Sequence, residues 1–130
     1  MMALFGLWCV ALLFGGMVLY SFGLAPFLFS VLPMPQARTT LRRAFPHFYL
    51  FVLLTSAAAA GLVCARDSDA ALALAAITVT TVPARQVLMP AINAATDAGA
   101  TQRFKVLHTV SVLITLAHIA LAGWVLSRFA

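Results

Sequence analysis

The chain has 130 residues, of which 64% are hydrophobic and 8% charged, and its acidic residues are three Asp and no Glu. A soluble domain usually has about a quarter charged residues, because water must solvate its surface. This composition excludes an ordinary water-soluble fold and favours a lipid bilayer as the main partner of the surface. The net charge of +5 commonly reports orientation in a membrane protein, so nucleic acid is not expected as a partner.

Stretches without charged residues locate the membrane-spanning helices. Four of them lie at residues 1–37, 44–65, 70–84 and 106–127. A spanning helix needs about 20 mostly apolar residues, and the third stretch continues past Arg85, whose long side chain can reach the headgroups. We therefore expect one all-α transmembrane domain over residues 1–130, with helices at about 3–32, 45–65, 70–89 and 103–128.

The first stretch begins at the N-terminus, where a secretory signal peptide would also lie. No Lys or Arg precedes it, and it runs from Ala3 to about Leu32, well beyond a signal-peptide core of about 7 to 15 residues. We expect it to remain as a helix. Since roughly 30 helical residues reach about 45 Å, this helix should tilt or bend, with Pro26 as its hinge.

The connections between the four helices are short, which predicts an up-down-up-down bundle. Six basic residues border the first and third loops, whereas Arg66 and Arg128 border the other side. Because Lys and Arg are retained in cytoplasmic loops, we expect a bacterial inner-membrane protein with loops one and three in the cytoplasm and both termini in the periplasm. The six residues are Arg38, Arg42, Arg43, Arg85, Arg103 and Lys105.

Small residues and cysteines suggest how the helices associate. In lipid, helices pack closely through Gly and Ala, and glycines such as Gly15, Gly16 and Gly23 mark contacts within the bundle or a seam between copies. A homo-oligomer or a larger membrane complex is therefore open. Cys9 and Cys64 both fall on the periplasmic side, where a disulfide is permitted, although two free thiols are equally ordinary.

Polar residues form a stripe along the fourth helix. His108, Ser111 and His118, together with Thr115, fall within an arc of about 80° at 100° per residue. Since polar groups in hydrocarbon are costly, we expect this stripe to face the bundle interior and to meet the polar side of the third helix. Interhelical hydrogen bonds alone would explain it.

A sharper hypothesis uses histidine depth. His47 and His108 lie just inside the second and fourth helices at the cytoplasmic side, and two opposed imidazoles are what axial ligation of a haem b requires. Met34 and Met89 near the same boundary would add thioether ligands for copper. The sequence has no CxxCH, no HExxH and no paired Cys.

Enzyme machinery is sparse in this chain. The three Asp and absent Glu provide no pair of carboxylates inside the membrane for acid and base catalysis. Ser111 and His108 are one turn apart, but a nucleophile elbow and a third triad member are missing. A non-catalytic protein is the expectation.

Several ordered motifs resemble the small membrane family around transmembrane protein 205, whose bacterial members form a domain of unknown function. The resemblance covers nearly the whole chain and implies an integral membrane protein, without a settled activity. It rests on Arg85 to Asp97 (RQVLMPAINAATD), Phe104 to Ser111 (FKVLHTVS), Gly15-Gly16, Ala25 to Phe29 (APFLF), Leu32-Pro33, and Phe45-Pro46 with Tyr49.

The third loop holds the most distinctive of these residues. Pro90 should end or kink the third helix near Met89. Asn93 and Asp97 then offer oxygens to the freed backbone N–H groups. Because Asp97 is the one acidic residue expected on the cytoplasmic side, we predict that it pairs with Arg85, either as a clamp or as an ion gate.

Three functions follow from these patterns. We expect first a small non-catalytic accessory or ligand-binding protein, in which Arg85, Asn93, Asp97, His108 and Ser111 form a polar cluster. The second is a haem- or copper-binding membrane protein that uses His108 with His47. The third is a minimal transporter or ion pathway.

Overall fold

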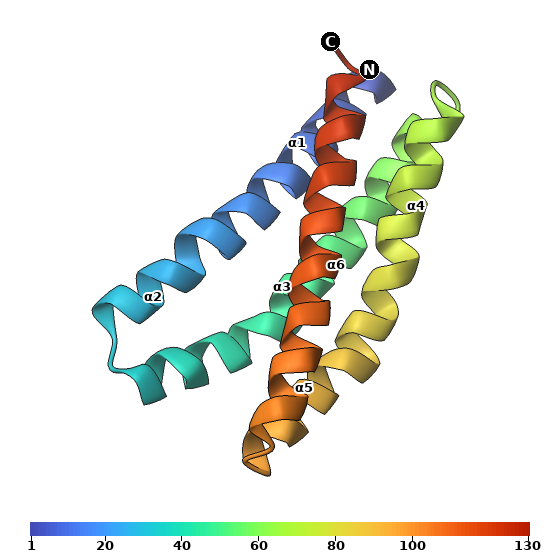
Figure 1. Cartoon of the computed structure of the whole chain (residues 1–130). Coiled ribbons are helices and arrows are strands. Elements are labelled where there is room, and N and C mark those ends of the chain that lie inside the picture. Colours follow the sequence, from blue (N-terminus) through green and yellow to red (C-terminus); the bar gives the residue numbers. More distant parts are fainter.

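The computed structural model describes all 130 residues, and the chain is helical apart from short turns (Figure 1). The order of elements is α1 (Met2–Val18), η1 (Leu19–Leu24), α2 (Ala25–Val31), α3 (Met34–Val63), α4 (Ser68–Pro83), η2 (Ala84–Leu88), α5 (Met89–Asp97) and α6 (Thr101–Ser127), where η1 and η2 are π-helical turns. Helical elements that follow one another without a break form four continuous helices, which we call rods. Each rod is long and apolar enough to cross a membrane, and the four cover Met2–Val31, Met34–Val63, Ser68–Asp97 and Thr101–Ser127. The predicted all-α four-helix fold is confirmed.

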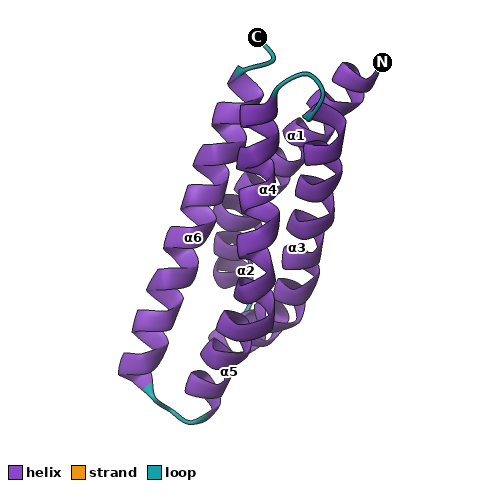
Figure 2. Ribbon diagram, turned by 90° about the vertical axis from the view of Figure 1, so that its right-hand side faces the viewer, coloured by secondary structure: helices purple, strands orange, loops and turns teal.

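The four rods run up and down. Figure 1 shows both termini at the same end of the bundle as the α3–α4 turn, and Figure 2 shows the α5–α6 turn at the opposite end. We call the first the terminal end; it carries Arg66, Asp67, Asp69 and Arg128. We call the second the basic end; it carries Arg38, Arg42, Arg43, Arg85, Arg103, Lys105 and Asp97. The excess of positive charge therefore lies at one end only.

Two predicted helix boundaries are wrong. The second helix begins at Met34 rather than near residue 45, because Pro33 provides an extended N-cap and Pro35 suits the first turn of a helix. The third helix continues through Pro90 and ends at Asp97. The residues expected as long first and third loops are thus mostly helical, and the turns at the basic end shrink to residues 32–33 and 98–100.

Both long helices that contain a late proline have a π-helical turn just before it. η1 ends one residue before Ala25-Pro26, and η2 is followed by Met89-Pro90. Proline lacks a backbone N–H and removes an i to i−4 bond, and a π turn accommodates that change of hydrogen bonding within a continuing helix. The irregularity expected at Pro26 and near Met89 is present, but neither helix ends there.

The core of the bundle is thin. Only 22 of 130 residues are buried, and they come mainly from α3 with its neighbours α1 and α4 and from the second half of α6. Large apolar side chains such as Leu12, Leu72, Val79 and Leu113 point outward. Water would not solvate so much apolar surface, whereas lipid does. The fold is that of a multi-pass membrane protein.

Candidate functional site

A lateral groove runs along the outside of the bundle between α1–η1–α2 and the first half of α3. Its volume is about 900 Å³, and eight of its eleven lining residues are hydrophobic. The lining residues are Leu12, Gly16, Leu19, Tyr20, Gly23, Leu24, Phe27, Ala44, His47, Phe48 and Phe51. The lateral groove is shallow and open along its outer side, and its lining is mostly apolar.

Missing side chains shape the middle of the lateral groove. Gly16 faces α3, and a Cβ at that position would lie 2.6 Å from the ring of Phe51. Such a distance is far below van der Waals contact, so the ring occupies space that only a glycine leaves free. Its neighbour Gly15 has open space where a Cβ would be. An added methyl group would therefore clash with Phe51 at Gly16 but would meet no atom at Gly15.

Aromatic rings form the wall near η1. The Tyr20 ring stacks on Phe48 with centroids 4.1 Å apart and meets Phe45 edge-on at 5.7 Å. The Tyr20 hydroxyl is buried and has no hydrogen-bond partner. A buried hydroxyl without a partner costs about 1 to 3 kcal/mol, which makes Tyr20 an unusual residue in this wall.

Positive charge borders the lateral groove at the basic end. His47 is part of the lining, and Arg43 lies one helical turn before it on the same face of α3. The Arg43 side chain is exposed and forms no hydrogen bond or ion pair within the protein. An apolar groove with an unpaired guanidinium at one mouth is suited to an amphiphile.

Polar side chains inside the bundle pair with one another. The Tyr49 hydroxyl oxygen lies 3.2 Å from Oγ of Ser111, and Oγ1 of Thr80 lies 2.7 Å from Nε2 of His118. Ser111 and His118 are buried as expected, but His108 is exposed and stacks on Phe104 with centroids 5.4 Å apart. The prediction that the whole stripe faces the interior is therefore wrong for His108, which has an aromatic neighbour one turn away to lie against.

The predicted pair of Arg85 and Asp97 is wrong. Asp97 instead accepts two hydrogen bonds from Arg42, at 2.7 and 2.9 Å, while Arg85 donates to the backbone carbonyl of Pro46 at 3.2 Å. The continuous helix through η2 and α5 is the reason, because Asp97 follows Arg85 by twelve positions and so lies about 18 Å away along the axis. Because the helix continues, Asn93 is a half-buried residue of α5 rather than a loop cap.

The proposed haem or copper ligands have different surroundings. His47 lines the lateral groove, His108 lies on Phe104, Met34 is exposed at the start of α3, and Met89 packs against the core. No three His, Cys, Asp or Glu side chains come together as a group that could hold a metal. Cys9 and Cys64 are free thiols. The haem and copper hypotheses, which need only two His or thioether ligands, stay predictions.

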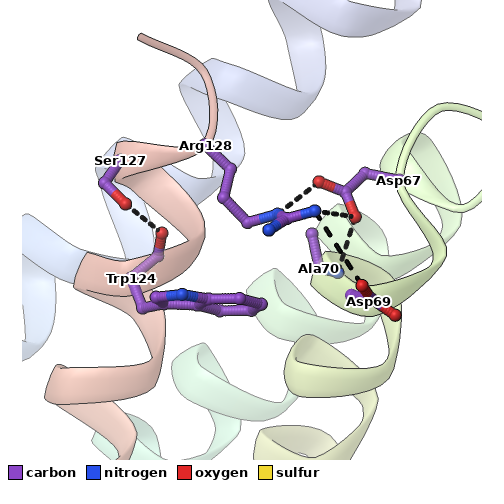
Figure 3. Close-up of polar contacts among 6 residues, drawn as sticks. All are labelled: Asp67, Asp69, Ala70, Trp124, Ser127 and Arg128. Atoms are coloured by element: carbon purple, nitrogen blue, oxygen red, sulfur yellow. Dashed lines mark hydrogen bonds and ion pairs between the residues drawn. The ribbon is translucent and has the colours of Figure 1, made fainter.

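An ion cluster at the terminal end was not anticipated from the sequence (Figure 3). Arg128 donates to both oxygens of Asp67, at 2.5 and 3.0 Å, and lies over the ring of Trp124. Asp67 also accepts from the backbone N–H of Ala70 as the N-cap of α4. The Arg128 guanidinium and this N–H hold the pKa of the Asp67 carboxyl below its usual range. The cluster fastens the C-terminus to the α3–α4 turn.

The comparisons with known proteins place the chain in a family. A family described as a domain of unknown function, DUF4149, matches residues 8–101. The chain belongs to this family. No curated protein and no solved structure shows significant similarity to it. For this DUF4149 chain, membership of an uncharacterised membrane-domain family agrees with the resemblance found in the sequence, while the narrower likeness to transmembrane protein 205 is not supported by the match.

The matched residues bear on the choice of site. Every residue that lines the lateral groove, from Leu12 to Phe51, lies within the part of this DUF4149 chain that matches the family. The ion pair of Arg42 and Asp97 also lies within it. His108, Ser111 and His118 lie beyond its end at residue 101. The lateral groove therefore lies wholly within the matched part of the chain.

Proposed function

We propose that the chain is a non-catalytic ligand-binding protein of the bacterial inner membrane, whose ligand enters the lateral groove from the bilayer. The observation that carries this proposal is the groove itself: an apolar hollow of about 900 Å³ on the outer face of a four-span bundle. A ligand that reaches this face must be dissolved in the membrane. Tyr20 and His47 are the polar side chains in the lining, and they supply no carboxylate for acid and base catalysis.

The proposal includes an orientation. The basic end carries six Lys or Arg residues and one Asp, while the terminal end carries two Arg and two Asp. The retention of Lys and Arg in the cytoplasm supports a basic end that faces the cytoplasm and termini that face the periplasm. The mouth of the lateral groove beside Arg43 then lies at the cytoplasmic leaflet.

Photo-crosslinking tests the groove as a binding site. The full chain in phosphatidylcholine nanodiscs is irradiated with a fatty acid that carries a diazirine in its chain, and the labelled peptides are mapped by mass spectrometry. We expect labels to concentrate on η1 and on α3 around Phe51. A uniform distribution over outward-facing residues such as Leu72 and Val79 would contradict the proposal, because those positions report ordinary lipid contact.

A matched pair of variants sharpens this test. Leu19 lines the lateral groove, whereas Phe22 lies in the same π turn, faces outward and is not part of the lining. Leu19→Trp should fill the middle of the groove and reduce labelling of Phe51 several-fold, while Phe22→Trp should leave it unchanged. Both side chains are largely exposed, so neither variant disturbs the core.

The same preparation tests the two other functions expected from the sequence. A haem protein that uses His47 and His108 would show a Soret band that His108→Ala removes, and a copper protein would retain copper in elemental analysis. A minimal transporter would carry protons or a solute across liposomes. Oligomeric state is read from the mass of the intact protein. If the proposed function is right, the purified protein shows no Soret band that His108→Ala removes, retains no copper, and carries neither protons nor a solute across liposomes.

A further inference from the structure

We infer that the ligand of the lateral groove is an anionic membrane lipid of the leaflet at the basic end, with one acyl chain in the groove and its phosphate on Arg43. This inference rests on the proposed function, since it names the ligand of the same site. Two properties of the groove support it: its length, and a charge at one mouth that has no partner within the protein.

The lateral groove is longer than the hydrocarbon of one leaflet is thick. Its lining on the first helix runs from Leu12 to Phe27, which is about 22 Å of helix at 1.5 Å per residue. The hydrocarbon of one leaflet is about 15 Å thick, half of a core of about 30 Å. An acyl chain that starts at the basic end therefore finds apolar wall along its whole length. The small-ligand volume of the groove also favours a single chain over a partner helix.

Charge at the mouth selects the headgroup. Arg43 lies about 6 Å along the axis from His47, one turn nearer the basic end. Side chains on a helix lean toward its N-terminus, which for α3 lies at the basic end, so we expect the Arg43 side chain to lean toward the headgroup layer. Guanidinium groups bind phosphate through two parallel hydrogen bonds, and His47 adds a ring N–H donor at the same mouth.

Arg42, the residue before Arg43, is already paired and offers no free guanidinium for a lipid phosphate. Arg42 is held by both oxygens of Asp97, whereas Arg43, the next residue, has no protein partner. A guanidinium that is exposed and unpaired at the mouth of an apolar groove is free to bind an anion from outside the chain. An anionic lipid supplies that charge and the acyl chain in one molecule.

Fluorescence quenching by brominated lipids tests the inference. Trp8 and Trp124 are replaced by Phe, and a reporter is placed either inside the lateral groove as Leu24→Trp or outside it as Phe22→Trp. Each protein is reconstituted in phosphatidylcholine nanodiscs with a minor fraction of brominated phosphatidylglycerol or, separately, brominated phosphatidylcholine. We expect the anionic lipid to quench the groove reporter more strongly than phosphatidylcholine does, and the two lipids to quench the outer reporter equally.

Two arginine variants decide the role of the headgroup site. Arg43→Gln should lower the preference of the groove reporter for the anionic lipid by about fivefold, the effect of one cation at a membrane surface. Arg103→Gln removes the same charge from another unpaired, exposed arginine at the basic end and should leave the preference unchanged. Equal effects of both variants would overturn the inference in favour of a general surface charge.

The remaining outcomes separate the two proposals. If the groove reporter is quenched equally by both lipids while photo-crosslinks still concentrate in the lateral groove, the proposed function stands and the anionic lipid is wrong. If neither probe distinguishes the groove from the outer surface, both fail. A dimer in the intact mass, with the groove reporter shielded from every lipid, would overturn both in favour of a second copy as the occupant.

Discussion

Arg42 and Asp97 join the second and third helices at the basic end through two parallel hydrogen bonds of 2.7 and 2.9 Å. Fifty-five positions separate them in the sequence, and the pair lies where α5 ends and the chain turns toward α6. A two-point contact between a guanidinium and a carboxylate fixes direction as well as distance. The pair therefore holds the end of α5 against α3, close to the turn of α3 that carries Arg43.

Removal of either partner should have a small effect on stability. The two side chains are 44% and 60% exposed, and exposed ion pairs contribute little because water and salt screen them. We expect Arg42→Ala and Asp97→Ala to lower the melting temperature in detergent slightly, and the double variant to cost no more than the larger single one. Additive effects in this double-mutant cycle would show that the pair does not form.

The terminal cluster predicts a specific acid sensitivity. The folded-state pKa of Asp67 lies below its unfolded value because Arg128 and the Ala70 N–H bind the carboxylate. The stabilisation is therefore present above the unfolded value of about 3.9 and is lost as the pH falls through the lower folded value. The melting temperature should fall below about pH 4, and Asp67→Asn should abolish this pH dependence.

The neighbouring acid is the control for this experiment. Asp69 lies 4.0 Å from Arg128 and its side chain is 73% exposed. Asp69→Asn removes one charge from the same turn but keeps the two-point contact and the N-cap. Its acid transition should match that of the unmodified chain. If Asp69→Asn and Asp67→Asn behave alike, the loss reflects the charge of the turn and not the pair with Arg128.

The contact between Thr80 and His118 should stabilise the bundle measurably. Thr80→Val leaves the buried imidazole without its 2.7 Å partner, and interhelical hydrogen bonds in membranes contribute about 0.6 kcal/mol on average and at most about 1.7. We expect Thr80→Val to lower the free energy of unfolding, measured in denaturing detergent, by an amount within that range. Thr109→Val is the matched control, because the Thr109 hydroxyl bonds only to Lys105 of its own helix and should cost almost nothing.

Membrane orientation is tested by the two native thiols. Cys64 is exposed at the terminal end and Cys9 is half-buried. In a Cys9→Ser background, a membrane-impermeant maleimide should label Cys64 in intact spheroplasts, because the account places the terminal end in the periplasm. Protection in spheroplasts with labelling only after lysis would reverse the orientation and place Arg43 at the other leaflet.

Much of the fold was readable from the sequence because a bilayer imposes a simple rule. Helices must be about 20 apolar residues long, so charge-free stretches located all four rods. The rule failed at the ends. Arginines in 38–43 suggested a loop, yet Ala37 and Leu41 are buried on the inner face of α3, and a helix at the membrane surface tolerates charge on its other side.

The candidate site was harder to predict from the sequence than the fold. The Arg85–Asp97 pair failed because the prediction broke the helix at Pro90, whereas the π turn η2 accommodates that proline and carries Asp97 away. The lateral groove depends on which faces of α1 and α3 meet, and hydropathy alone does not determine that choice. A usable signal was present in Gly16 and Gly23, seven residues apart and so on one helix face, opposite the aromatic side of α3.

One methyl group tests the lateral groove most directly. Gly16→Ala places a Cβ 2.6 Å from the ring of Phe51, a groove-lining residue that must then shift, whereas Gly15→Ala meets nothing within 4 Å. Native mass spectrometry of the two purified variants and the unmodified chain compares the lipid that each retains. The account predicts retained lipid in the unmodified chain and in Gly15→Ala, with a several-fold loss in Gly16→Ala. Equal retention in Gly15→Ala and Gly16→Ala would contradict it.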